Sequence, residues 1–411
     1  GDVSGTLTDT CNGTNYSFTG LTLTGADGLK SVTATIADSA GNSSQVNLNL
    51  QKDISVPTAI LSGAPTPGSY SNVTSLTVTV GGADVSEYLY KFGDGTTDCT
   101  NATGYSVATG IATTISINAG TMGADGAKKL CVRAKDASGN IQSLAAATEV
   151  SWTKDTALPT LAFTSPAAGS YVNLATQSSF AVSGTCSEVG TSNVNIDGDI
   201  TAPVQVNCVA GVPNTWTSNV NFSAASNGPV FLLISQTDAA GNVGSRTRAF
   251  VKDAVNPTIG WTTPSAGAFI NNANKAAFAV TGTCSDYSAT PNVALTSTAL
   301  TSTVNVACDG ANWTANLAFN NGDEAVTVRA TITDAAGNST FSDRSFSKDT
   351  NNPVLAITSP SAGSYVNDTN KASFAVSGTC SDVGTSNVVV SGSASATVNC
   401  VAGAPNTWSA N

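Results

Sequence analysis

The sequence contains no histidine among its 411 residues. Histidine is the side chain best suited to proton transfer near neutral pH, and it is the commonest protein ligand of transition metals. Its absence excludes Ser-His-Asp and Cys-His catalysis and most zinc chemistry. The acidic residues mostly follow a repeat along the chain, whereas a catalytic carboxylate pair would be irregular and specific to one unit. The sequence therefore predicts that the protein is not an enzyme.

Charged residues are also scarce, at 10 % of the chain, against roughly 25 % in an ordinary soluble domain. The 16 Lys and Arg are outnumbered by 27 Asp and Glu, which gives a formal net charge of −11. Such a surface cannot neutralise phosphates, so we expect neither nucleic acid nor an anionic membrane surface as a partner. No apolar run approaches the roughly 18–20 residues of a membrane-spanning helix, so no membrane insertion is expected in this segment.

What the chain does have is internal repetition. The hexapeptide TDAAGN occurs at 237–242 and again at 333–338, with the variants ADSAGN at 37–42 and KDASGN at 135–140. Each is followed by a Lys-Asp pair with a proline four residues after the Asp: KDISVP at 52–57, KDTALP at 154–159, KDAVNP at 252–257 and KDTNNP at 348–353. A proline there suits a boundary between units, because it cannot pair within a central strand.

These signals divide the chain into five parts. We predict the back part of a repeat at 1–53, a divergent domain at 54–155, repeats at 156–253 and 254–349, and the front part of a repeat at 350–411. Short alternating apolar runs separated by Gly, Pro, Asn and Asp predict an all-β fold of about seven strands per unit. Residues 1 to about 19 duplicate what 390–411 supply. We therefore expect a window of a longer tandem array rather than subunits that complete each other head to tail.

The recurring turn has two interpretations. Asp at the first position and Gly at the fourth are typical of a structural hairpin turn, which predicts turns at Asp38 and Gly41, Asp136 and Gly139, Asp238 and Gly241, and Asp334 and Gly337. Alternatively, turn and linker aspartates meet and bind calcium at the junctions between domains. The candidate ligands are Asp53, Asp136, Asp155, Asp238, Asp253 and Asp334. The low carboxylate count and the lack of an EF-hand loop weigh against this alternative.

The chain has nine cysteines, and the phase of the repeat pairs eight of them. The predicted disulfides are Cys186–Cys208, Cys284–Cys308, Cys380–Cys400 and, in the divergent unit, Cys99–Cys131. Cys11 is left over. With no C-x-x-C and no histidine, disulfides are favoured over zinc, and they place the protein in an oxidising, extracytoplasmic space. Leu130, Val132 and Ala134 alternate opposite to Cys131, so this bridge is expected outside the core.

Three tryptophans, Trp216, Trp313 and Trp408, occupy the same position in their units. They can stack on sugars, but their place within alternating apolar strands favours core packing. Tyr88, Tyr90 and Phe92 in the divergent unit pose the same choice, and we again expect packing within a strand.

Together, the TDAAGN turn, the following strand, the Lys-Asp linker and Cys-bearing units of about 100 residues resemble bacterial immunoglobulin-like (Big-type) repeats of large surface adhesins and extracellular stalk proteins. The divergent unit resembles a fibronectin-like sandwich. The resemblance implies tandem Greek-key β-sandwiches in a linear array, cell-surface location, neighbouring repeats as the main partners, and in some relatives junction calcium.

We therefore expect a non-catalytic stalk or spacer segment of a surface adhesin or fibre protein, without a cofactor unless calcium occupies the junctions. Two alternatives remain. One is a binding module for glycan or protein, with a ligand on a host or prey surface or in a matrix. The other is self-assembly into a surface filament through strand edges.

Overall fold

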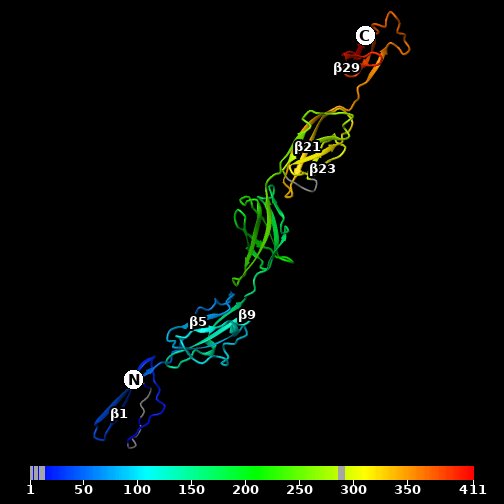
Figure 1. Cartoon of the computed structure of the whole chain (residues 1–411). Coiled ribbons are helices and arrows are strands. Elements are labelled where there is room, and N and C mark those ends of the chain that lie inside the picture. Colours follow the sequence, from blue (N-terminus) through cyan, green and yellow to red (C-terminus); the bar gives the residue numbers. More distant parts are fainter. Residues whose placement is uncertain (1–2, 4–7, 9–13, 286–291) are drawn as a thin grey trace. The chain divides into compact units, whose positions relative to one another are not determined.

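The computed structural model describes residues 3, 8, 14–285 and 292–411, and the secondary structure of these residues is almost entirely β-strand (Figure 1). The predicted all-β class with repeated immunoglobulin-like sandwiches is confirmed. Cys11, which the repeat leaves unpaired, lies outside the described residues.

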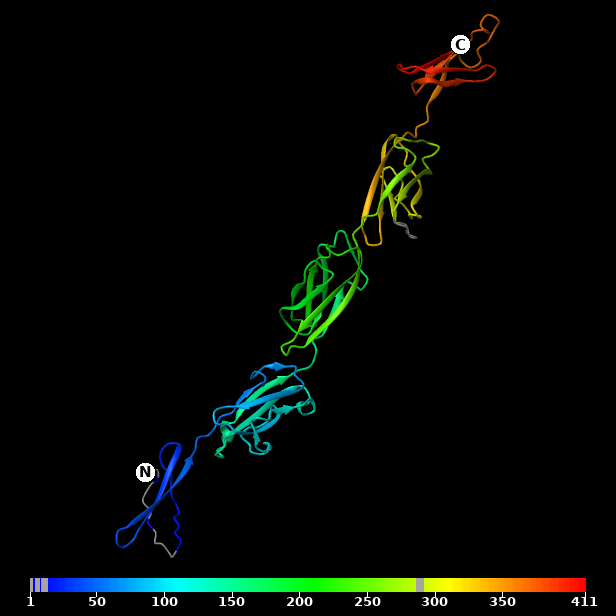
Figure 2. The ribbon, with the colours of Figure 1, turned by 60° about the vertical axis from the view of Figure 1, so that its left-hand side comes forward.

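The strands of 161–253 form two sheets, drawn in green in Figure 2. One has the order β11-β13-β16 and the other β12-β18-β17-β14-β15. The strands are β11 Leu161–Ser165, β12 Tyr171–Asn173, β13 Phe180–Cys186, β14 Gly190–Gly198, β15 Val204–Cys208, β16 Thr215–Val220, β17 Gly228–Thr237 and β18 Val243–Asp253. Strand β12 runs parallel to β18, while β14 is antiparallel to both of its neighbours. The first two strands of the sandwich thus belong to different sheets: β11 is an edge strand of the three-stranded sheet, and β12 is an edge strand of the five-stranded sheet, as in immunoglobulin-like domains.

The strands of 259–348 repeat this topology, with the sheets β19-β21-β24 and β20-β26-β25-β22-β23. Their bounds are β19 Ile259–Thr263, β20 Phe269–Ile270, β21 Phe278–Cys284, β22 Val293–Thr296, β23 Val304–Val306, β24 Asn312–Leu317, β25 Glu324–Thr333 and β26 Ser339–Lys348. Alternate residues of β25 enter one core, which also takes Phe278 from the first sheet and Phe346 from the second. The apolar residues that recur at every second position of the sequence are therefore the ones that face the core.

The divergent part, 60–154, has the same division into three and five strands. The sheets are β3-β5-β8 and β4-β10-β9-β6-β7. The elements are β3 Ile60–Ser62, β4 Tyr70–Ser71, β5 Leu76–Gly81, β6 Glu87–Asp94, β7 Thr109–Gly110, β8 Ile115–Ile117, the helical turn α1 Ala119–Met122, β9 Gly126–Lys135, the 3₁₀ turn η1 Leu144–Ala146 and β10 Thr148–Lys154. Tyr88 belongs to the core of this sandwich, and Tyr90 and Phe92 pack against it. The prediction of packing within the strand is confirmed for these aromatic residues.

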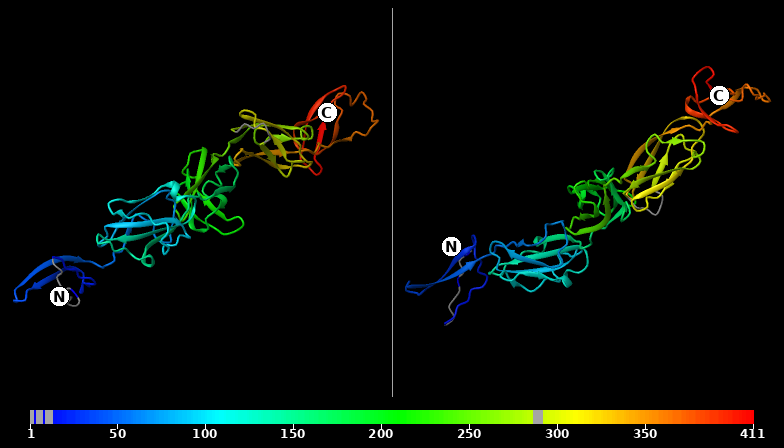
Figure 3. Two further views of the ribbon diagram at one scale, coloured as in Figure 1. Left: turned by 90° about the horizontal axis from the view of Figure 1, so that it is seen from below. Right: turned by 45° about the horizontal axis from the view of Figure 1, so that its top comes forward.

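The remaining strands form smaller sheets. The hairpin of β1 Gly28–Ala37 and β2 Ser43–Lys52 pairs over ten residues (blue in Figure 1). The strands in 355–410 form the sheets β27-β28-β31 and β29-β30 (orange to red in Figure 3). Their bounds are β27 Leu355–Ser359, β28 Val376–Cys380, β29 Gly384–Val390, β30 Ala396–Cys400 and β31 Thr407–Ala410.

The three repeated tryptophans lie in the cores, as predicted. Trp216, Trp313 and Trp408 are fully buried, so none offers a face to a sugar. Each indole lies against a glycine of the S/T-G-T-C segment, and an added Cβ at Gly184 would come within 2.5 Å of the Trp216 ring. The repeated glycine is therefore required by the close approach of the tryptophan.

We expect Gly184→Ala to destabilise the sandwich of 161–253 by about 1–3 kcal/mol, because the new methyl group collides with Trp216 and the β11 backbone. Calorimetry of the full chain measures the loss. The matched control is Gly81→Ala, where an added Cβ meets nothing within 4 Å. Equal effects of the two substitutions would contradict the packing argument.

Candidate functional site: the repeated turn and the segment it contacts

The repeated turn is held by its own aspartate. Asp238 Oδ1 accepts hydrogen bonds from the backbone N–H groups of Ala240 at 2.8 Å and Asn242 at 2.9 Å. Its Oδ2 accepts the Asn242 side-chain amide at 2.8 Å. Gly241 has φ of +89°, a conformation that favours glycine, and it donates its N–H to the Asp238 carbonyl. These contacts explain why Asp, Gly and Asn recur at fixed spacing.

The structure places all eight predicted turn residues in turns of this kind. The glycines have φ of +89° at Gly41, +98° at Gly139 and +86° at Gly337. In three cases the turn joins the two long strands of a hairpin, β1–β2, β17–β18 and β25–β26. In the divergent sandwich it follows β9 and leads to η1.

The asparagine that ends the turn makes a second contact, with the segment that enters the same sandwich. The side-chain amide of Asn242 donates to the backbone oxygen of Asp155 at 2.9 Å. The equivalent Asn338 donates to Asp253 O at 2.9 Å, and Asn140 donates to Asp53 O at 3.1 Å. Each acceptor is the aspartate of a Lys-Asp signal, 85 to 87 residues earlier in the chain. The two repeated motifs therefore meet in space and form one structural element.

The aspartates of the Lys-Asp signals shape the entering segment as well. The carboxylates of Asp53, Asp155 and Asp253 each accept the N–H two residues later, at 3.2, 3.0 and 3.1 Å. This local bond is an Asx-turn, which offers the backbone a turn where the strand ladder has ended.

The lysine before each aspartate is a residue whose role the sequence analysis did not identify. Lys154, Lys252 and Lys348 are buried. Their ammonium groups contact the start of the neighbouring strand or the loop just before it. Lys154 donates to Asp125 at 2.7 Å and Lys252 to the Ala225 carbonyl at 2.6 Å, both in the loop, and Lys348 donates at 2.8 Å to Glu324, the first residue of β25. The signal that could have revealed them was their invariant place in the repeat, combined with the scarcity of lysine elsewhere.

The candidate calcium ligands are engaged by these hydrogen bonds. Both carboxylate oxygens of Asp136, Asp238 and Asp334 accept bonds from the backbone and side chain of the turn asparagine. Within the part of the chain that the structure describes, no group of three or more His, Cys, Asp or Glu is placed to hold a metal ion. Calcium at the junctions stays a prediction.

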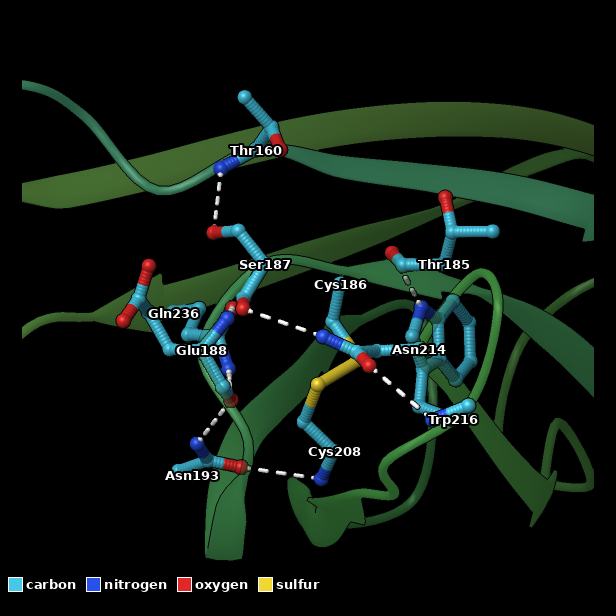
Figure 4. Close-up of a disulfide and its surroundings, with 11 residues drawn as sticks. Thr160, Thr185, Cys186, Ser187, Glu188, Asn193, Cys208, Asn214, Trp216 and Gln236 are labelled. Atoms are coloured by element: carbon cyan, nitrogen blue, oxygen red, sulfur yellow. Dashed lines mark hydrogen bonds between the residues drawn. A yellow bond between two sulfur atoms is a disulfide. The ribbon is translucent and has the colours of Figure 1, made fainter.

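The four predicted cysteine pairs are joined as disulfides. Cys186–Cys208 links β13 of one sheet to β15 of the other, next to Trp216 (Figure 4). The N–H of Cys208 donates to the side chain of Asn193 at 3.0 Å, and Asn193 in turn donates to the Glu188 carbonyl at 2.6 Å. Asn292 and Asn387 accept the same bond from Cys308 and Cys400 at 2.9 Å. This asparagine is a further repeated residue that the sequence analysis missed.

The bridge of the divergent sandwich lies on the other side of its sheet. Leu130, Val132 and Ala134 point into the core, and Cys131 between them does not belong to that core, as expected. Cys131 is nevertheless fully buried, because the chain around Cys99 and Tyr105 covers it: the Tyr105 hydroxyl donates to the Cys99 carbonyl at 2.9 Å. The disulfide thus fastens the loop after β6 to the outer face of β9.

No protein-family model matches the sequence, and no curated protein matches it. Among solved structures, the chain is similar to a tetra-tandem repeat in the extending region of a large adhesion protein, with 19 % identity, 79 % of this chain and 82 % of that chain covered, and a TM-score of 0.30. It is also similar to a Ca²⁺-stabilised, ice-binding adhesin of an Antarctic bacterium, at 18 % identity, 79 % and 82 % coverage and a TM-score of 0.30.

A further similarity is to the I67–I69 I-band fragment of titin, with 10 % identity, 72 % and 99 % coverage and a TM-score of 0.34. These scores do not bear on function, and the assignment of the fold rests on the strand order and pairing described above. No helix among the described residues is long and apolar enough to span a bilayer.

We expect Asn242→Ala to destabilise the sandwich of 161–253 by about 1–3 kcal/mol, because it removes a buried donor to two acceptors. Asn42→Ala is the matched control, since Asn42 makes the same turn bond to Asp38 but is exposed. Thermal unfolding and limited proteolysis near residue 155 measure the difference. An Asn42→Ala effect as large as that of Asn242→Ala would contradict a role for the entering segment.

The hydrogen bonds of Asp125, the partner of Lys154, and of the turn aspartate Asp238 lead us to expect a loss of stability in acid. The hydrogen bond from Lys154, followed by those from Thr156, lowers the pKa of Asp125 to about 2. For Asp238, desolvation raises the pKa, but the hydrogen bonds from Asn242, Ala240 and Gly241 outweigh it and leave the pKa below its usual value. Since these folded-state pKa values lie below the unfolded ones, the stabilisation is complete above about pH 4 and is lost as the pH falls towards about 2.

The melting temperature should therefore be steady from about pH 5 to 7 and fall below about pH 4. Asp125→Asn should lower the stability of the sandwich of 60–154 at neutral pH and flatten its acid dependence. An unchanged acid limb in this variant would show that Asp125 is not one of the groups responsible.

Proposed function

We propose that the chain is a non-catalytic spacer, or stalk, segment of a bacterial surface adhesin or extracellular fibre protein, with 54–155, 156–253 and 254–349 as its complete units. The observation that carries this proposal is the use of the repeated polar residues. Asp, Asn and Lys recur in every unit, and each is engaged with the backbone or with a neighbouring polar group of its own fold. Repetition of residues that serve the fold favours a structural role over a ligand site in one unit.

The disulfides support the extracellular part of the proposal. Three of them connect the two sheets of a sandwich at equivalent places, and all four have Cα–Cα distances of 5.5 to 6.1 Å. Disulfides persist in oxidising compartments and are rare in the cytosol. A spacer outside the cell also gains from a covalent link that keeps the two sheets from separating.

The covalent link makes a testable contribution. Replacing Cys284 and Cys308 together by Ser should lower the stability of the sandwich of 259–348 by about 3 kcal/mol, because the bridge closes a loop of 24 residues. Denaturant unfolding of the full chain measures this. Under reducing conditions the double variant and the unmodified chain should unfold at the same denaturant concentration. A difference that persists there would show that packing, not the bridge, is responsible.

A spacer is tested by exchanging one unit for another. The chain is displayed on cells with an unrelated binding domain fused beyond residue 411, and the ligand of that domain is placed beneath a polymer brush. A strand of ten residues spans about 34 Å, so deleting 156–253 should shorten the reach by roughly that length and reduce capture several-fold. Putting a second copy of 254–349 in its place should restore capture.

Two results would contradict the spacer. One is failure of the exchanged unit to restore capture although the display level and the affinity for free ligand are unchanged. The other is binding by the full chain without the added domain, on a glycan array or to surface proteins, that disappears when 156–253 is exchanged. Either result would favour a binding module whose surface is specific to one unit.

A further inference from the structure

The buried lysine of the sandwich of 161–253 has no acidic partner. Lys252 is 5 % exposed, and its ammonium group donates to backbone oxygens, at 2.6 Å to that of Ala225. Within the described part of the chain it forms no ion pair. The equivalent Lys154 binds the carboxylate of Asp125 at 2.7 Å. Because burial of a charge is costly unless an opposite charge accompanies it, the sandwich of 161–253 lacks a stabilising contact.

The position that supplies this carboxylate is occupied by an asparagine in 161–253. Asp125 lies eleven residues before the aspartate of its turn, and Asn227 lies at the same distance before the aspartate of the next turn. Asp27 and Asp323 occupy the position in the other two hairpins. Asn227 is therefore an amide at a place where the equivalent residues are acids.

The hydrogen bonds show that these residues are equivalent in space as well. Each accepts the backbone N–H of the residue that follows a Lys-Asp signal: Asp125 from Thr156 at 2.8 Å, Asn227 from Ala254 at 3.1 Å, and Asp323 from Thr350 at 2.8 Å. Asp125 has a second carboxylate oxygen, which accepts the bond from Lys154. In Asn227 the second group is an NH₂, a donor that cannot accept a bond from an ammonium group.

The sandwich of 259–348 obtains its carboxylate in another way. Lys348 binds Glu324, the first residue of β25, at 2.8 Å. The first residue of β17 is Gly228, which has no side chain to offer. The sandwich of 161–253 therefore has neither of the two acids that serve the buried lysine in the other complete units.

Asn227 and Gly228 form the dipeptide in which an asparagine loses its amide most readily, because glycine has no Cβ to hinder the attack of its backbone nitrogen. The Gly228 nitrogen attacks Cγ of Asn227, a C–N bond forms, and the side-chain nitrogen leaves as ammonia with the proton of Gly228. Water then opens the succinimide ring, to aspartate or to isoaspartate. Asn227 is exposed, so water reaches it, and the N–H of Ala254 polarises the amide carbonyl that is attacked.

We propose that Asn227 is a modification site, at which hydrolysis of the amide provides the carboxylate that Lys252 lacks. The aspartate keeps the bond from the N–H of Ala254 with one oxygen and accepts the ammonium group with the other, as Asp125 does with Lys154. The reaction needs only water, and it stabilises the sandwich after folding. The proposal is independent of the spacer function, because it concerns the chemistry of a single unit.

Peptide mapping of the folded full chain tests whether the site reacts. During incubation at mildly alkaline pH, the peptide that contains Asn227 should gain the small mass by which OH exceeds NH₂, and chromatography separates the aspartate form from the isoaspartate form. Asn221 is exposed in the same connection but precedes Phe222, a bulky residue, so it should stay intact. Asn227→Gln should convert far more slowly, because its longer side chain closes a less favourable ring.

Substitution tests what the product does. Asn227→Asp should raise the melting temperature of the sandwich of 161–253 by a few degrees over the freshly prepared chain, because Lys252 gains a charge-assisted hydrogen bond. In a Lys252→Met background the same substitution should bring no gain. Asn219→Asp is the control for added charge, since Asn219 is exposed in β16, and it should not stabilise the sandwich.

Four results would overturn the proposal. The first is that Asn227 stays intact in the folded chain while it converts in the chain unfolded by denaturant. The second is conversion to isoaspartate alone, which lengthens the main chain by one carbon instead of restoring the acid of the other units. The third is an Asn227→Asp chain no more stable than the freshly prepared one. The fourth is an equal gain in the presence and in the absence of Lys252.

Discussion

The hydrogen bonds of one asparagine amide in each sandwich organise most of what recurs in this protein. Asn242 donates to the turn aspartate and to the backbone of the segment that enters the sandwich, so it joins the last hairpin to the first residues of the same unit. The contact is buried, and a buried amide that lost its acceptors would be costly. This requirement fixes the spacing of the turn, the Lys-Asp signal and the length of the unit between them.

The low charge content of the chain is consistent with this arrangement. With 10 % charged residues, the surface has few ion pairs to contribute, and exposed pairs contribute little in any case. The repeated stabilising contacts are instead hydrogen bonds of Asp and Asn side chains with each other and with the backbone, together with buried lysines that bind a carboxylate or a backbone oxygen. These bonds also occupy the carboxylates that a junction calcium would need. The recurrence of the turn aspartate is therefore explained by these hydrogen bonds, and the turn alone does not imply a metal.

The parts of the structure that depend on local chemistry could be predicted from the sequence. The alternation of apolar residues predicted the strands, and the Asp and Gly of the turn predicted the hairpins. The phase of the repeat predicted the cysteine pairs and the burial of Trp216. The missed residues depend on partners that lie far away in the chain. The side chain of Asn242 donates a hydrogen bond to the backbone of Asp155, which lies 87 residues earlier in the chain. Lys252 binds the carbonyl of Ala225, which lies in a loop outside the Lys-Asp signal. Both residues recur at equivalent positions of the repeats, but the sequence does not show which groups they contact.

The place of the closing hairpin in the chain has a consequence for any array of these units. In the sandwiches of 161–253 and 259–348 the two longest strands come last in sequence, yet they lie between the second and fourth strands, as β26 and β25 lie between β20 and β22. The front of a unit is therefore a sheet with a gap, and the hairpin that fills it belongs to the end of the same repeat. The hairpins of different repeats share the turn and the number of paired residues, as β1–β2 and β25–β26 do. Correct pairing within a unit thus rests on the short connection between its strands, because the strands of equivalent units differ little in shape.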